Sequence, residues 1–366
     1  MTLSKAVNIY DCTRRRPGAL PGIGCLLGIA FLIAGSPERG LAAPLTGWEM
    51  NARLGTGINL GNALDAPDGE GAWWHGKIAP EFFDDFKAAG FKHVRLPVTW
   101  ANHLLAASPY TIDPVFLDRV VQVVGWANQR GLVVVLNTMH EGWFKADPDG
   151  QMPRFEALWQ QLAARFKSVP DNRLVFEVLN ESDSSHISAA QTNAMNARIL
   201  RAVRSVSPSR CVIIGAVGDN AERLINGELQ APHDTYVIAT YHCYDPWFFV
   251  SGQPRNPDEA KWGSDADKAD YRRRMDGIKR WSDAHKVPIY LGEWATSGKC
   301  DAQARRTYYN YVATQARALG FSLAIWDDGG DMRIYNRETR QWTADLLDTV
   351  FPGRRHAAPA TAIDAR

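Results

Sequence analysis

Two acidic residues, Glu181 and Glu293, each follow an apolar stretch and could carry out acid–base chemistry. Glu181 follows Leu174-Val-Phe-Glu-Val-Leu-Asn180, and Glu293 follows Pro288-Ile-Tyr-Leu-Gly292. The apolar character of both stretches predicts strands buried on both faces, as in parallel sheets. Two carboxyl groups at one cleft are what cleavage of a glycosidic bond requires, because one protonates the leaving oxygen while the other attacks or activates water. Taken alone, Asn180 would equally predict a helix N-cap.

The two acids can meet only if their strands belong to one sheet. From Leu45 onward, strand-like segments alternate with amphipathic helix-like segments, which predicts a parallel sheet covered by helices. Eight strands are expected, at residues 54–60, 92–98, 132–139, 174–180, 211–217, 236–244, 288–294 and 321–327. No glycine-rich phosphate loop follows the first strand, so a single-domain α/β protein with a (β/α)8 TIM barrel over residues 44–352 is favoured over an open doubly wound sheet.

Further polar and aromatic residues fall at the ends of these strands, where a barrel would gather them on one rim. They are Arg95, His140, Asn180, His242, Tyr244 and Trp326. A guanidinium inside an apolar strand needs a carboxylate partner, and we expect Arg95 to pair with Glu293 through its planar fork. Because side chains alternate along a strand, His242 and Tyr244 point the same way and Cys243 faces the helices. Each residue alone would fit a packing or ion-pair role, but their joint position favours an active site.

The composition indicates a neutral sugar as the partner. The formal net charge is +1, which gives no electrostatic reason to expect nucleic acid or an anionic membrane. The chain has 13 Trp, whose flat apolar faces suit sugar rings. Candidate sugar platforms in loops at the expected rim are Trp73, Trp74, Trp143, Trp247 and Trp262. Among the 9 His there is no His-Glu-x-x-His motif or close Cys/His cluster, so no metal and no cofactor are expected.

Both termini read as segments outside the barrel. Residues 1–43 contain an arginine triplet, an apolar run and the small-residue site Leu41-Ala42-Ala43, which predicts a secretory signal and an extracellular or periplasmic protein. Its removal would leave Cys211, Cys243 and Cys300, an odd number that argues against a disulfide framework, although a bridge between Cys243 and Cys300 stays open. The Ala- and Pro-rich residues 353–366 are expected to be disordered, and the protein is expected to be a monomer.

Short motifs over nearly the whole expected barrel resemble those of glycoside hydrolase family 5, the retaining cellulase-type barrels. The motifs are Gly57-Ile-Asn-Leu-Gly-Asn62, Val94-Arg-Leu-Pro97, Asn180-Glu181, His242-x-Tyr244-x-Pro246, Gly292-Glu-Trp294 and Ala324-Ile-Trp326. The resemblance implies Glu181 as the acid/base and Glu293 as the nucleophile. It also implies that Arg95 and Tyr244 orient Glu293, that Asn180 binds the sugar 2-hydroxyl, and that His242 lines the acid/base side above a floor made by Trp326.

One position departs from the family pattern. The family usually has a substrate-contacting His where this chain has Met139, and His140 is retained as the substrate-binding residue there. The resemblance implies a secreted endo-β-1,4-glucanase that acts on a β-glucan. A β-mannanase or a xyloglucanase on the same scaffold is the alternative, since fold does not fix the substrate. A non-catalytic carbohydrate-binding barrel is the alternative from another class, and the paired acids argue against it.

Overall fold

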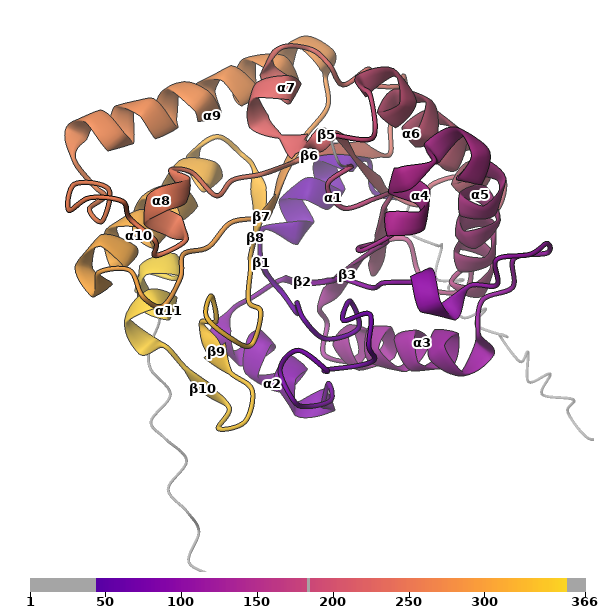
Figure 1. Ribbon diagram of the computed structural model, residues 1–366, viewed down its shortest axis with the longest axis horizontal. Coiled ribbons are helices and arrows are strands. Elements are labelled where there is room, and N and C mark those ends of the chain that lie inside the picture. Colours follow the sequence, from indigo (N-terminus) through magenta and orange to yellow (C-terminus); the bar gives the residue numbers. More distant parts are fainter. Residues whose placement is uncertain (1–43, 183–184, 354–366) are drawn as a thin grey trace, which may run out of the picture. The chain divides into compact units, whose positions relative to one another are not determined.

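Eight parallel strands close into a barrel in which each strand pairs with its sequence neighbours and β8 returns to β1 (Figure 1). The computed structural model describes residues 44–182 and 185–353, so the predicted signal and the predicted tail beyond Gly353 lie outside the described residues. The strands are β1 (Thr56–Asn59), β2 (His93–Leu96), β3 (Val133–Asn137), β4 (Leu174–Glu177), β5 (Val212–Asn220), β6 (Val237–His242), β7 (Ile289–Glu293) and β8 (Ser322–Ile325). The predicted (β/α)8 barrel is confirmed, and only β5 runs past its predicted range.

Helices lie around the outside of the strands (Figure 1). The longer ones are α2 (Pro80–Ala89), α3 (Pro114–Gln129), α5 (Pro148–Arg165), α6 (Ala189–Arg204), α9 (Asp265–His285) and α10 (Ala302–Ala318). Shorter elements are α1 (Gly47–Leu54), η1 (Ala101–His103), α4 (Gly142–Ala146), α7 (Ala221–Ile225), α8 (Trp247–Val250), α11 (Ala344–Val350) and the hairpin of β9 (Tyr335–Asn336) and β10 (Gln341–Trp342). None of the helices within the described ranges combines the length and hydropathy needed to span a bilayer.

The helix ends follow from local sequence. The Asp113 side chain accepts the backbone N–H of Val115 and so begins α3. Ser188 and Gln191 form a reciprocal capping box at the start of α6. Helix α2 ends at Gly90, whose φ of 106° is a conformation that side chains rarely allow. These signals fix where each helix leaves its strand, and therefore where the strand-end residues lie.

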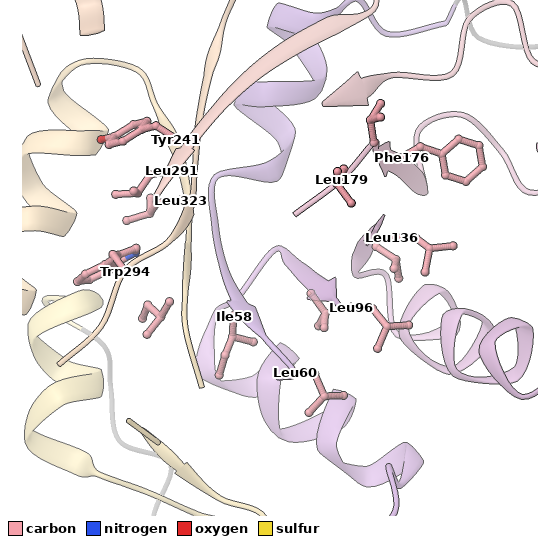
Figure 2. Close-up of a cluster of buried hydrophobic side chains, with 14 of the residues drawn as sticks. Ile58, Leu60, Leu96, Leu136, Phe176, Leu179, Tyr241, Leu291, Trp294 and Leu323 are labelled. Carbon is pink, nitrogen blue, oxygen red and sulfur yellow. The ribbon is translucent and has the colours of Figure 1, made fainter. Parts of the chain in front are cut away.

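Strand side chains alternate between two apolar regions. The outward-facing set packs against the helices and includes Ile58, Leu96, Leu136, Phe176, Tyr241, Leu291 and Leu323 (Figure 2). Burying a side chain of this size contributes about 2 kcal/mol. The inward-facing set, with Val133, Val175, Ile213 and Tyr290, packs against Met50 and Leu54 of α1. Helix α1 therefore covers the end of the barrel where the strands begin, called here the amino end, and leaves the opposite, carboxyl end for polar residues.

The cysteines do not cross-link the barrel. Cys211, Cys243 and Cys300 are all free thiols, so the bridge left open between Cys243 and Cys300 is not formed in the described structure. Cys243 is buried beside Tyr271 of α9, as the alternation of His242, Cys243 and Tyr244 predicted. The Cys300 thiol donates to the carbonyl oxygen of Phe249 at 2.9 Å. Packing and hydrogen bonds, rather than disulfides, hold this region together.

Candidate active site

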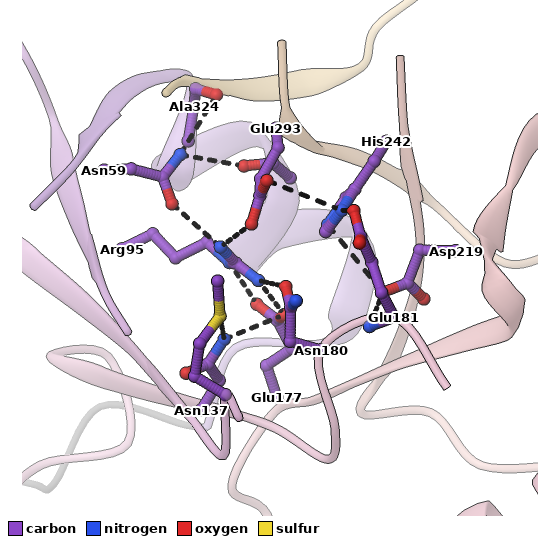
Figure 3. Close-up of polar contacts among 12 residues, drawn as sticks. Asn59, Arg95, Asn137, Glu177, Asn180, Glu181, Asp219, His242, Glu293 and Ala324 are labelled. Carbon is purple, nitrogen blue, oxygen red and sulfur yellow. Dashed lines mark hydrogen bonds and ion pairs between the residues drawn. The ribbon is translucent and has the colours of Figure 1, made fainter. Parts of the chain in front are cut away.

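Arg95 is the centre of a buried polar network at the carboxyl end of the barrel (Figure 3). Its Nε and Nη2 donate to the two carboxylate oxygens of Glu177 at 2.8 and 2.5 Å. Its Nη1 donates to Glu293 Oε1 at 2.6 Å and to Asn59 Oδ1 at 2.9 Å, and its Nη2 also reaches Asn180 Oδ1 at 2.7 Å. The predicted contact with Glu293 is present, but the prediction that the planar fork serves Glu293 is wrong. The paired donors Nε and Nη2 instead bind the carboxylate of Glu177, which lies on β4, two strands away from β2.

Glu293 is held from two sides at the end of β7. Arg95 bonds one carboxylate oxygen, and the Tyr244 hydroxyl donates to the other at 2.8 Å. The Glu293 side chain is only 6% exposed. Gly292 lets the neighbouring strand approach, because a Cβ there would lie 2.8 Å from His242 Nε2. Each carboxylate oxygen of Glu293 therefore has a fixed hydrogen-bond donor, and the orientation of the carboxylate is set.

Glu181 lies beyond the end of β4 and faces His242. Its Oε1 lies 2.8 Å from His242 Nδ1, and the Glu181 side chain is 43% exposed. Its φ of +42° is in the left-handed region, which non-glycine residues seldom adopt and which is common at functional sites. Carboxylate oxygens of Glu181 and Glu293 and a ring nitrogen of His242 all lie within 4.8 Å of one another. The two strand-end acids are thus brought together, one sheltered and one open to solvent.

The charges in this cluster balance around His242. Although burial opposes its protonation, the carboxylates of Glu293, Glu181 and Asp219 raise the pKa of His242 to about 9. Partial burial opposes ionisation of Glu181, but the hydrogen bond and charge of His242 lower its pKa. Burial raises the pKa of Asp219 to about 7 despite the attraction of His242. Near neutral pH, an imidazolium therefore lies beside an ionised Glu181.

Four interior residues of this network were not among the predicted site residues: Asn59, Asn137, Glu177 and Asp219. Asn137 donates to Glu177 Oε1 at 3.4 Å, and Asn59 donates to the carbonyl oxygen of Gly292 at 3.0 Å (Figure 3). The signal for Glu177 was in the sequence, since it is an acid inside an apolar strand and so matches the carboxylate that Arg95 was predicted to need. Asp219 gave no such signal, because it lies beyond the predicted end of its strand.

Comparison with known proteins identifies the scaffold that carries this network. A family model described as cellulase (glycosyl hydrolase family 5) matches residues 56–331. The chain belongs to this family. Endoglucanase H of Acetivibrio thermocellus is 42% identical over 315 residues, covering 84% of this chain and 34% of that protein. The chain therefore spans about a third of the length of that relative.

Solved structures show the same family barrel. The crystal structure of endoglucanase Cel5A from Thermotoga maritima matches with a TM-score of 0.79 at 34% identity, covering 84% of this chain and 100% of that one. A second structure of that enzyme, in complex with mannotriose, matches with a TM-score of 0.77 at 35% identity, covering 83% and 99%. The prediction of a glycoside hydrolase of the cellulase type is thus confirmed at the level of the family.

At the rim of this family 5 barrel, His140 and Met139 point to different places. The His140 ring lies 5.6 Å from the ring of Trp73 in an edge-on arrangement, and burial lowers the pKa of His140. Met139 is 4% exposed, and its sulfur accepts from Asn137 Nδ2 at 3.8 Å. Met139 therefore belongs to the polar interior, whereas His140 packs against the exposed ring of Trp73.

The predicted sugar platforms divide by exposure. Trp73 and Trp247 are 46% and 55% exposed, whereas Trp74 and Trp143 are partly buried against the core. Trp262 was wrongly placed on the surface, because its ring is 6% exposed and packs edge-on against Tyr308 at 5.0 Å. Sequence position in a long loop did not reveal that this loop folds back onto α9 and α10.

Trp326 lies just past the end of β8, close to the first strand. A Cβ at Gly61 would lie 2.6 Å from the Trp326 ring, so the glycine in the Gly57–Asn62 motif gives this indole its space. Its backbone N–H donates to the carbonyl oxygen of Trp294 at 3.0 Å. The sequence predicted Trp326 for this rim, and the structure places it there.

Glu181, His242 and Glu293 also form a group that could hold a cation, because each offers one ligand atom within the same 4.8 Å. The Glu293 carboxylate, however, already accepts the Arg95 guanidinium on one oxygen and the Tyr244 hydroxyl on the other. Glu181 Oε1 is likewise engaged by His242. A metal would have to compete with a buried positive charge, so these residues fit acid–base chemistry better than metal binding.

Proposed function

We propose that this chain is a retaining endo-β-1,4-glucanase, with Glu293 as the nucleophile and Glu181 as the acid/base. The observation that carries the proposal is the separation of the two carboxylates, whose oxygens lie within 4.8 Å. Retaining glycosidases hold their carboxyl groups about 5 Å apart, whereas inverting enzymes need about 6.5–9.5 Å to admit a water between them. The short separation favours double displacement through a covalent glycosyl-enzyme.

In the first step, Glu293 attacks the anomeric carbon and the glycosidic C–O bond breaks. Arg95 and Tyr244 hold one oxygen each, so the carboxylate is oriented before the substrate arrives. The leaving oxygen takes a proton from Glu181, and that proton is shared over the 2.8 Å contact between Glu181 and His242. The side-chain oxygen of Asn180 accepts a hydrogen bond from Arg95 Nη2, which leaves the Asn180 amide N–H group to donate to the sugar 2-hydroxyl.

In the second step, water attacks the anomeric carbon and the ester bond to Glu293 breaks. Glu181 now acts as the base that takes the proton from water, a role that suits a side chain 43% exposed to solvent. The proton taken from water restores the one that Glu181 and His242 share over their 2.8 Å contact, which the first step gave to the leaving oxygen. The carboxylate of Glu293 is freed at the same time, so both acids return to their starting states.

The choice of β-glucan rests on the family and on relatives named endoglucanases. A β-mannan is the second candidate, because a similar Thermotoga maritima enzyme has been crystallised with mannotriose. Xyloglucan and a non-catalytic sugar-binding role remain the other predicted alternatives. Rates and products on cellulose, barley β-glucan, xyloglucan and mannan separate all four, since a binding protein would release no reducing ends from any of them.

The roles of the two acids are tested by removing each and adding azide. Glu181→Ala should still form the glycosyl-enzyme from a substrate whose leaving group needs no protonation, such as 2,4-dinitrophenyl β-cellobioside. Deglycosylation should then stall, and azide should restore turnover and yield the β-glycosyl azide. Glu293→Ala cannot form the intermediate, and any azide product should have the α configuration. Nuclear magnetic resonance of the product anomers reads out both variants.

The wild-type protein provides the independent check. A 2-fluoro cellobioside should label Glu293, and mass spectrometry of the digested protein locates the label. A label on another residue, or inversion at the anomeric centre, contradicts the assignment. Exchanged behaviour of the two alanine variants would instead reverse the roles of Glu181 and Glu293.

We also propose that the enzyme is exported and acts as a monomer. The support is the arginine-apolar-small pattern of residues 1–43 and a barrel that closes on its own strands. N-terminal sequencing of enzyme recovered from outside the cytoplasm should begin near Ala42 or Ala43. Sedimentation of that enzyme should give the mass of one chain, and a full-length N-terminus in the exported fraction would contradict cleavage.

A further inference from the structure

We infer that Asp219 is a positioning residue for the proton donor, because its carboxylate accepts the backbone N–H of Glu181 and thereby fixes where the Glu181 carboxyl group lies. This inference rests on the proposed function of Glu181 as acid/base. Within the described part of the chain, the polar contacts of the Asp219 carboxylate are with Glu181 and with its partner His242 and not with Glu293, so its effect on the reaction passes through the proton donor.

A bulge in β5 brings Asp219 into the barrel. The pairing of β5 with β6 shifts register between Gly215 and Asn220, so that extra residues are accommodated on β5. Bulges of this kind redirect side chains and are common next to active sites. Gly218 and Asp219 both have positive φ, at 68° and 48°. Gly215 provides the space, since a Cβ there would lie 1.7 Å from Asp219 Oδ1.

The inserted carboxylate reaches the chain around Glu181. Asp219 Oδ2 accepts the Glu181 N–H at 2.8 Å (Figure 3). The Gly218 N–H donates to Ser182 Oγ at 3.3 Å. These bonds tie the end of β5 to the two residues that follow Asn180, beyond the end of β4. Glu181 itself has a φ of +42°, a conformation that costs about 1–3 kcal/mol and persists only where surrounding contacts impose it. Asp219 supplies such a contact.

The same carboxylate also faces the partner of Glu181. Asp219 Oδ2 lies 3.8 Å from His242 Nε2, while the other ring nitrogen of His242 contacts Glu181. Glu181 is therefore located from both directions, through its backbone by Asp219 and through its carboxylate by His242. Asp219 is fully enclosed, and an isolated carboxylate is costly to bury. We therefore attribute this buried carboxylate to the hydrogen bond that it accepts from the Glu181 N–H.

The experiment compares two substrates that differ in their need for a proton donor. Phenyl β-cellobioside requires protonation of its leaving group, and 2,4-dinitrophenyl β-cellobioside does not. Asp219→Ala should lower kcat/KM about 10²-fold on the phenyl substrate, because a small displacement of a catalytic group can cost that much. The same variant should stay within about threefold of wild type on the dinitrophenyl substrate. Asp219→Asn keeps an oxygen that can accept the Glu181 N–H, and it should recover most of the loss.

Asp65→Asn is the matched control. Asp65 is also fully buried and accepts two backbone N–H groups, from Asn62 and Ala63, but it contacts neither acid. It should lower the thermal midpoint without changing the ratio of the two substrates. Equal losses on both substrates in Asp219→Ala, or an Asn variant as impaired as the Ala variant, would overturn the inference. Wild-type rates test the proposed function and the ratio tests Asp219, so the two failures are distinguishable.

Discussion

The two ends of the barrel interior use neighbouring inward-facing residues of one strand in opposite ways. At the amino end, His93 of β2 donates from Nδ1 to the Leu54 carbonyl oxygen at 2.8 Å and accepts the Tyr290 hydroxyl at Nε2, 3.0 Å away. At the carboxyl end, Arg95 meets the carboxylate of Glu177. Both side chains are fully buried. The amino end is thus neutral and the carboxyl end is densely charged, although His93 and Arg95 are only two positions apart on β2.

Burial opposes the charged form of both side chains, but only Arg95 has carboxylate partners that keep it charged. Burial, helped by the charge of Arg95, lowers the pKa of His93 to about 4, so the amino end stays neutral. Arg95 pays the same desolvation cost, but Glu177 and Glu293 hold its pKa above the ordinary value. Replacing a buried ion pair by apolar residues often costs little or even stabilises a protein. The charges at the carboxyl end are therefore better explained by chemistry than by stability, and the following predictions test that division.

The largest effect is expected for Arg95→Lys. A lysine keeps the charge but cannot bond Glu177 with two nitrogens while also reaching Glu293, so the nucleophile loses its orientation. We expect kcat/KM on 2,4-dinitrophenyl β-cellobioside to fall about 10³-fold, the equivalent of losing two charge-assisted hydrogen bonds. Steady-state kinetics on purified, folded protein measures the effect. A lysine variant with wild-type rates would refute the role assigned to the guanidinium.

Arg210→Lys is the matched control from the amino end. Arg210 is 1% exposed, but its guanidinium donates to backbone carbonyl oxygens of Pro170, Leu174, Phe166 and Val169, in the segment that enters β4. The same substitution should lower the free energy of unfolding by about 1–3 kcal/mol while leaving kcat/KM within about twofold. Comparable losses of activity in both lysine variants would mean that the two ends are not separable.

The sequence was informative where local patterns repeat. All eight strands were predicted because each is a short apolar run bounded by turn or helix-capping residues. Catalytic groups of such barrels collect at the carboxyl ends of the strands, and this predicted one common rim for Glu181, Glu293, Arg95, His242 and Tyr244. Their contacts follow from the closed parallel order of the strands. The predicted fold and the predicted position of these five residues therefore depend on the same strand order.

What the sequence could not provide depends on register and on loop packing. The fork of Arg95 grips Glu177 rather than Glu293 because β2 and β4 set that carboxylate level with both donors, a relation between strands that no local pattern encodes. Asp219 enters the site through a bulge that moves the end of β5 by several residues. Trp262 is buried because its loop folds back onto Tyr308. Each of these outcomes is decided by contacts between distant segments.

An intermediate effect is expected for stability against pH at the amino end. His93 takes up a proton below about pH 6.5 when unfolded but only near pH 4 when folded, so its contribution is present above pH 6.5 and is lost as the pH falls. The loss between pH 7 and 4 is on the order of 3 kcal/mol. His93→Gln can keep both hydrogen bonds without titrating. Denaturant unfolding at several pH values should show a shallower fall for the variant, and parallel curves would contradict a neutral, buried His93.

The smallest effect concerns exposed tryptophans at opposite ends. Trp73, 46% exposed beside His140, is expected to stack on a sugar remote from the cleaved bond, so Trp73→Ala should raise KM on barley β-glucan about fivefold. Short aryl cellobiosides do not reach that position and should keep their kcat/KM. Trp48 is 45% exposed on α1 at the amino end, and Trp48→Ala is the matched control that should leave both substrates unchanged. If the polymer KM rose equally in both variants, exposure alone and not position on the carboxyl end would account for sugar binding.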